Sequence, residues 1–131
     1  MSIEDNKALV TRFWKLFSES KFDEVLALLA EDATWWVAGK TKLSATYTKA
    51  QFAELVKGIA EQADGGLSVT PNPGGLCAEG DRVSVEAKSY GKFKNGRVYQ
   101  NEYHFMMVIR GGKFVSIREY LDTEHVTETF A

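Results

Sequence analysis

The hydrophobic period of the chain changes near residue 66, and this change limits the possible folds more than any other feature. Before Gly65-Gly66, apolar residues recur at helical spacing. After it, short apolar runs rich in β-branched and aromatic residues alternate with tight turns. Three helices followed by an antiparallel meander predict an α+β fold, and the length of 131 residues fits one domain over 1–131.

Three stretches of the first half predict helices. Each begins with a hydroxyl residue that is followed three positions later by an acid or an amide, as at a capped helix N-terminus. These pairs are Ser2 with Asp5, Ser20 with Asp23, and Thr48 with Gln51. The third helix is expected to stop at Gly65-Gly66, and residues 33–38 predict a short strand between the second and third helices.

Turn residues divide the second half into strands. Asn95-Gly96 and Gly111-Gly112 predict two-residue hairpins, Gly80-Asp81 predicts a turn, and the segment 71–75, with its two prolines, must interrupt the first strand. If both hairpin loops have two residues, His104 lies directly opposite Glu119 on one face of the sheet. A bulge near either turn would reverse the faces.

The sheet face that carries Glu119 is expected to form the core and a pocket. The residues expected to bind a substrate there are Trp14, Trp35, Val37, Phe52, Val56, Ser89, Met106 and Ile117. The opposite face mixes aromatic and charged residues, a composition typical of protein interfaces. A homodimer interface is expected on it, formed by Tyr103, Phe105, Arg118 and Tyr120.

Residues 101–105 (NEYHF), the Gly111-Gly112-Lys113 turn and residues 118–123 (REYLDT) resemble the final hairpin of SnoaL-like domains. These domains belong to the nuclear-transport-factor-2-like superfamily, with ketosteroid isomerases and limonene epoxide hydrolases. The resemblance implies a cone-shaped curved sheet packed with three N-terminal helices around one apolar pocket. It does not fix a reaction, because the fold hosts enzymes, binding modules and transport factors.

Within this resemblance, Glu119 matches the acid of the arginine–acid–tyrosine motif in the last strand of limonene epoxide hydrolases. The strand that carries their second acid and its arginine has Ala87 and Ser89 at its inward positions here. The epoxide-opening triad is therefore absent from the expected site.

Glu119 and His104 are the candidate catalytic residues. Desolvation in an apolar cone raises the pKa of a carboxyl group, and a neighbouring imidazolium lowers it, so the pair is suited to general acid–base catalysis. Three interpretations stay open: catalysis, orientation of a ligand, and a purely structural ion pair. The matching functions are a cofactor-independent isomerase, cyclase or hydratase, a small-ligand binding module, and a dimeric interaction domain. The expected ligand is a small apolar carbonyl, lactone, epoxide or sterol-like compound.

Composition excludes several other functions. A net charge of −2 argues against nucleic-acid binding. The two histidines, His104 and His125, lack the spacing of a zinc site, and without a glycine-rich phosphate loop we expect no cofactor. Neither a signal peptide nor a membrane-spanning run is recognisable. The single cysteine, Cys77, is expected to be a small buried residue and suggests a reducing, cytoplasmic location.

Overall fold

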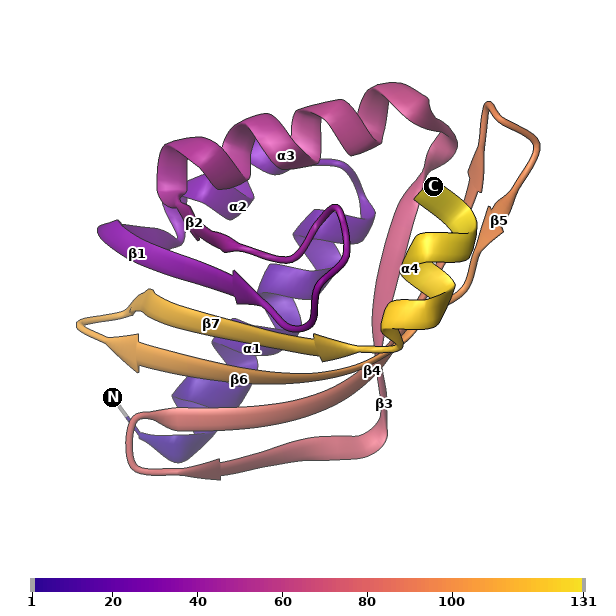
Figure 1. Ribbon diagram of the computed structural model, residues 1–131. Coiled ribbons are helices and arrows are strands. Elements are labelled where there is room, and N and C mark those ends of the chain that lie inside the picture. Colours follow the sequence, from indigo (N-terminus) through magenta and orange to yellow (C-terminus); the bar gives the residue numbers. More distant parts are fainter. Residues whose placement is uncertain (1, 131) are drawn as a thin grey trace.

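A curved, unclosed sheet runs through the molecule, and helices α1 and α3 pack against it (Figure 1). The computed structural model describes residues 2–130. The elements are α1 (Ile3–Ser18), α2 (Phe22–Ala27), β1 (Leu29–Val37), β2 (Thr46–Thr48), α3 (Lys49–Gln62), β3 (Ala63–Glu79), β4 (Arg82–Phe93), β5 (Val98–Tyr99), β6 (Glu102–Arg110), β7 (Lys113–Leu121) and α4 (Thr123–Phe130). The strand order is β2-β1-β7-β6-β4-β3, with β5 paired to β4, and only β1 and β7 pair in parallel. The α+β prediction is confirmed.

Two of the three predicted helix caps are confirmed. Ser2 with Asp5 and Thr48 with Gln51 form complete capping boxes at α1 and α3. The prediction for Ser20 was wrong. Ser20 has a φ of +59° and its backbone N–H donates to the carbonyl of Phe17, so it ends α1 instead of opening α2.

The glycine and proline segments lie inside β3, which is an edge strand. Helix α3 ends at Gln62, before the predicted stop, and Gly65 and Gly66 adopt φ values of +88° and +90° where the pairing with β4 shifts register. A second shift falls between Pro71 and Leu76, so the prolines interrupt the ladder as expected. An edge strand tolerates both because one side of it pairs with no other strand. Cys77, expected to be buried, is exposed on this strand.

Two departures from the predicted pairing flank β6. Gly111-Gly112 forms the expected two-residue loop, with both residues at positive φ. Three residues after Gly112, the pairing skips Val115, which makes a bulge. The other hairpin has a three-residue loop, because the backbone N–H of Phe93 donates to Arg97 across residues 94–96 and Gly96 takes the left-handed position.

Each departure moves β6 by one residue relative to its neighbour, so β6 turns its other face to the core. Phe105 is 1% exposed and pairs with Glu119, whereas His104 is exposed and pairs with Tyr120. The predicted pairing of His104 with Glu119 was therefore wrong. Both shifts involve β6, so β4 and β7 keep their predicted faces relative to each other. The residues expected to point inward from these two strands are therefore buried: Val83, Val85, Ala87, Ser89 and Ile117.

Helix α3 closes the curved sheet into a cone. It contacts β1 and β2 at one end of the sheet and β3 at the other, so strands that are far apart in the sheet meet beneath it. The three predicted N-terminal helices are present, and α4 was not predicted. In Figure 1, α4 follows β7 at the end where β5 projects. None of the helices between residues 2 and 130 has the length and apolar character needed to cross a bilayer.

The register of β6 predicts opposite effects at two adjacent residues. Phe105→Ala should lower the free energy of unfolding by about 3–5 kcal/mol, because it empties a buried aromatic position. His104→Ala should change it by less than about 0.5 kcal/mol, because the side chain is exposed. Urea denaturation measures both. Equal losses, or a larger loss for His104→Ala, would mean that β6 faces the other way.

Candidate functional site

A cavity of about 60 Å³ lies inside the cone between α1, α3 and the inner face of the sheet. Its walls are mostly aromatic and aliphatic, and the polar groups among them are one carboxyl and two phenols. The aromatic walls are Trp14, Trp35, Phe52 and Phe105, and the polar lining residues are Glu119, Tyr99 and Tyr103. A concave, mostly apolar space with a few polar groups is the usual form of a small-molecule site.

Stacked rings give the cavity flat walls. The rings of Trp35 and Phe52 stack with centroids 4.0 Å apart at 12°, which joins β1 to α3. Trp14 from α1 packs on Phe105 from β6 with centroids 4.4 Å apart. Such walls suit a planar apolar ligand.

Glu119 is the acidic residue in this wall. It lies on β7 beside Val37, and its Oε1 accepts a hydrogen bond of 2.9 Å from the indole Nε1 of Trp35. Burial raises the pKa of this carboxyl to about 7, while the hydrogen bond from Trp35 acts in the opposite direction. The group can therefore both take up and release a proton near neutral pH.

The two phenols, Tyr99 and Tyr103, belong to a buried hydroxyl network with Ser89. The hydroxyl of Tyr103 lies 3.0 Å from Ser89 Oγ and 3.1 Å from the Tyr99 hydroxyl, and it can donate its single hydrogen to one of them at a time. Asn101 Nδ2 donates to the Tyr99 hydroxyl at 3.0 Å. Burial raises the pKa of Tyr99 to about 12 and that of Tyr103 well above its usual range, and the charge of Glu119 adds to both shifts. Both phenols therefore stay protonated at physiological pH.

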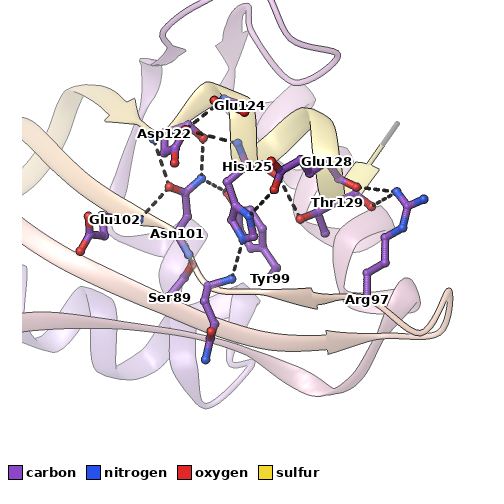
Figure 2. A network of polar contacts seen from close by, with 11 residues as sticks. Ser89, Arg97, Tyr99, Asn101, Glu102, Asp122, Glu124, His125, Glu128 and Thr129 are labelled. Carbon is purple, nitrogen blue, oxygen red and sulfur yellow. Dashed lines mark hydrogen bonds and ion pairs between the residues drawn. The ribbon is translucent and has the colours of Figure 1, made fainter.

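Helix α4 begins at a cap that ties it to β6. The Oδ1 of Asp122 accepts from the backbone N–H groups of Glu124 and His125, and the backbone carbonyl of Asp122 accepts from Asn101 Nδ2 (Figure 2). The backbone N–H of Asp122 donates to Asn101 Oδ1. One buried asparagine therefore connects the start of β6, the end of β7 and the start of α4.

The far end of α4 is held by the β4–β5 hairpin. Arg97 Nη1 donates to the carbonyls of Glu128 and Thr129, and Asn95 Nδ2 donates to the same Thr129 carbonyl. The ring of His125 stacks on Tyr99 at 5.3 Å and 1°, and its Nε2 accepts from the backbone N–H of Gln100. These contacts place α4 beside the cavity, where Phe130 is one of the lining residues.

The cavity adjoins a surface depression between α3, α4 and the segment that links β1 to β2. Four partly exposed apolar residues line both the cavity and a depression on the surface outside it. They are Leu43, Leu55, Ile59 and Phe130.

The structure places the expected pocket residues in three groups. Trp14, Trp35, Val37, Phe52 and Val56 line the cavity. Ser89 and Ile117 are buried on the inner side, and Ser89 bonds to Tyr103 from behind the wall. Met106 belongs to the outer face of β6, so the expectation that it lines the pocket was wrong, for the register reason given above.

The same register reverses the placement of three further residues. Tyr103 and Phe105 were expected at an outer dimer interface, yet both are buried and line the cavity. His104 lies on the outer face, where its Nε2 contacts Ser84 Oγ, and it cannot partner Glu119 there. Arg118 and Tyr120 do lie on the outer face, and the guanidinium of Arg118 sits 3.9 Å over the ring of Trp36.

Tyr99, Asn101 and Phe130 are site residues that the sequence interpretation missed. A signal for the first two was present, because large or buried residues occupy every odd position from 99 to 109. Polar and charged residues dominate the even positions between them. The signal for α4 was weaker: Asp122 at a cap position, followed by Val126 and Phe130 at helical spacing. Among residues 2–130, no three His, Cys, Asp or Glu side chains converge as a metal site would require.

Solved structures with the same fold include proteins of several kinds. An NTF2-like protein from Burkholderia xenovorans LB400 is 28% identical, with a TM-score of 0.81 and coverage of 100% of this chain and 99% of that one. A putative polyketide cyclase from Xanthomonas campestris pv. campestris is 18% identical, with a TM-score of 0.82 and 98% of both chains covered. TerC, co-crystallised with polyporic acid, is 20% identical, with a TM-score of 0.79 and coverage of 95% and 96%.

The sequence also matches the SnoaL-like domain over residues 10–117. The chain belongs to the SnoaL-like domain family, within the NTF2-like and ketosteroid-isomerase-like fold, and the predicted resemblance is confirmed. A comparison with curated proteins gave no match. The family match ends two residues before Glu119, so the role of this carboxyl must be argued from the geometry of this chain.

The raised pKa of Glu119 predicts that the free energy of unfolding depends on pH. Between its usual value of 4.5 and about 7, the unfolded chain releases this proton while the folded chain keeps it. The contribution of Glu119 to stability therefore falls as pH rises through this window and stays low above it. Glu119→Gln should match wild type near pH 4 and exceed it at pH 8 by on the order of 3 kcal/mol.

Urea denaturation at a series of pH values measures this difference. Glu102→Gln, which removes one negative charge from an exposed position of β6, is the matched control and should show no such trend. A stability difference between Glu119→Gln and wild type that stays constant from pH 4 to pH 8 would contradict the assigned environment of Glu119.

Proposed function

We propose that the cavity binds a small apolar molecule and that Glu119 acts on it as a general acid or base, without a cofactor. The observation that carries this proposal is the carboxyl group of Glu119, with a pKa of about 7, in an otherwise aromatic cavity. A catalytic group works best when its pKa lies near the working pH. The indole N–H of Trp35 orients the Glu119 carboxyl. Trp35 is thus the partner of Glu119 that His104 was expected to be.

The reaction class that fits is that of an isomerase, cyclase or hydratase. Glu119 would remove a proton next to a carbonyl, or activate a water molecule, and return the proton later in the cycle. The charge that develops would lie among protonated phenols and aromatic rings instead of bulk water. The kinship with a putative polyketide cyclase supports this class, and TerC supports use of the cavity by a ligand.

A binding module without chemistry is the second candidate, favoured by the small volume of the cavity. In that case Glu119 orients a ligand by accepting a hydrogen bond, and the aromatic walls provide the affinity. Both candidate functions involve the same ligand. They differ in whether Glu119 transfers a proton or only orients the ligand. A binding module would change its affinity on Glu119→Gln and would turn nothing over.

A thermal-shift screen against small apolar carbonyl, lactone, epoxide and sterol-like compounds tests the proposal. A compound at a hundred times its Kd should stabilise the wild-type protein by about 2.7 kcal/mol. For a hit that is turned over, Glu119→Gln should lower kcat by at least about a hundredfold, the range typical of general acid–base groups.

Glu102→Gln again serves as the control and should keep full activity, because Glu102 is exposed on β6. Turnover that survives unchanged in Glu119→Gln would refute the acid–base role. No hit across the library would refute the cavity as a ligand site and leave the outer sheet face as the functional surface.

We further propose that the outer face of the sheet joins two copies of the chain, in a reducing, cytoplasmic setting. Trp36, Arg118 and Tyr120 form a stacked cluster there, with Tyr120 43% exposed. Aromatic residues and arginine are enriched in protein interfaces. Their exposure together on a sheet face is what supports a partner at this position.

Sedimentation of wild type should give a dimer, and Arg118→Glu should shift it toward monomer by placing a carboxylate in the interface. Arg110→Glu makes the same charge change at the exposed end of β6, where Arg110 pairs with Asp81, and should leave the dimer intact. A dimer that persists in Arg118→Glu, or a wild-type monomer, would exclude this interface.

A further inference from the structure

The imidazole of His125 connects the middle of α4 to β5 and to the residue that follows this strand. Its ring stacks on the ring of Tyr99 with centroids 5.3 Å apart at 1° (Figure 2). Its Nε2 lies 2.9 Å from the backbone nitrogen of Gln100. A backbone N–H can only donate, so Nε2 is the acceptor and carries no hydrogen. The ring is therefore neutral in this arrangement, and its one hydrogen lies on Nδ1.

Acidic side chains outnumber basic ones around this ring. Nδ1 lies 3.5 Å from Oε2 of Glu128, which is one turn further along α4. The guanidinium of Arg97 is directed at backbone carbonyls at the end of the helix, and the phenol of Tyr99 stays protonated because burial raises its pKa. Neighbouring carboxylates favour the charged form of an imidazole. The titratable and charged groups of the surrounding elements are Asp122, Glu124 and Glu128 in α4 and its cap, Arg97 and Tyr99 in the β4–β5 hairpin, and Glu102 at the start of β6 (Figure 2).

His125 cannot take up a proton without losing a contact. The new hydrogen on Nε2 would point at the hydrogen of the Gln100 backbone N–H, so the hydrogen bond between them is lost when the ring becomes charged. Imidazole rings are the side chains that ordinarily change charge between pH 5 and 8. The side chain of His125 is 23% exposed, so it exchanges protons with the solvent. Proton uptake and the attachment of α4 to Gln100 therefore exclude each other.

We propose that the contact between His125 and Gln100 is a pH-sensitive switch. The neutral ring ties the middle of α4 to Gln100 and Tyr99, and the protonated ring releases Gln100 and loosens α4. Tyr99 and Phe130, on either side of this contact in the chain, both line the cavity, so one wall of the cavity responds to the switch. The switch requires neither a ligand nor a reaction, so it stands independently of the proposed function.

Two NMR measurements at the ends of this pH range, pH 8 and pH 5, test the inference. The ¹⁵N shifts of the His125 ring at pH 8 show which nitrogen carries the hydrogen. Amide exchange gives protection factors for Gln100 and for α4, each divided by those of the central strands β6 and β7. This ratio removes changes in global stability, because α4 can open locally while the central strands stay folded.

In wild type at pH 8 the hydrogen should lie on Nδ1. The normalised protection of Gln100 should fall about fivefold from pH 8 to pH 5, the effect of one neutral hydrogen bond, and that of α4 should fall with it. His125→Phe keeps a flat ring for Tyr99 but has neither acceptor nor charge, so its protection should be low at both pH values. His104→Gln, which removes the other histidine, and Glu119→Gln, which removes the carboxyl that titrates in the same range, should both behave as wild type.

Three results would overturn the inference. If the ring hydrogen lies on Nε2 at pH 8, the ring does not accept from Gln100. If the normalised protection of Gln100 in wild type is the same at both pH values, protonation does not release the contact. If His125→Phe keeps the pH dependence, or His104→Gln or Glu119→Gln abolishes it, another group is the sensor. The ring tautomer is measured on wild type alone, so it tests the inference even where a variant fails to fold.

Discussion

The bulge at Val115 and the three-residue loop before Arg97 hold β6 in the one register that turns Tyr103 and Phe105 inward. Because side chains alternate along a strand, a slip of one residue would replace an aromatic wall with Glu102, His104 and Met106. Three properties of the cavity depend on this register: the ring packed on Trp14, the hydroxyl network of Tyr103, and part of the apolar surroundings that desolvate Glu119.

The cavity combines opposite hydrogen-bonding capacities in a small space. Glu119 accepts when ionised and donates when protonated, and it switches near neutral pH. Tyr99 and Tyr103 stay protonated, because burial raises the pKa of both phenols. A bound molecule would thus meet two protonated phenols and one carboxyl group whose hydrogen-bonding role depends on pH.

The sequence predicts the element order, two of the helix caps and the inner faces of β4 and β7, because these depend on local patterns. It misplaces β6 because a two-residue loop at Asn95-Gly96 and an unbroken ladder after Gly111-Gly112 are the simplest assumptions, and each is wrong by one residue. The large side chains at the odd positions from Tyr99 to Ile109 indicate the correct buried face of β6. This alternation is better evidence for the strand register than the assumed lengths of the turns. The Tyr99 hydroxyl network could not be predicted, since it depends on how Asn101 reaches across to Asp122.

Asn101 couples helix α4 to the Tyr99 phenol through its hydrogen bonds. Its amide holds the first turn of α4 through Asp122 and holds the Tyr99 phenol through the same NH₂ group (Figure 2). A displacement of α4 that moved Asp122 would therefore also disturb the hydrogen bond that orients the Tyr99 phenol. The position of α4, whose Phe130 lines the cavity, and the orientation of the phenol in the cavity wall thus depend on one side chain.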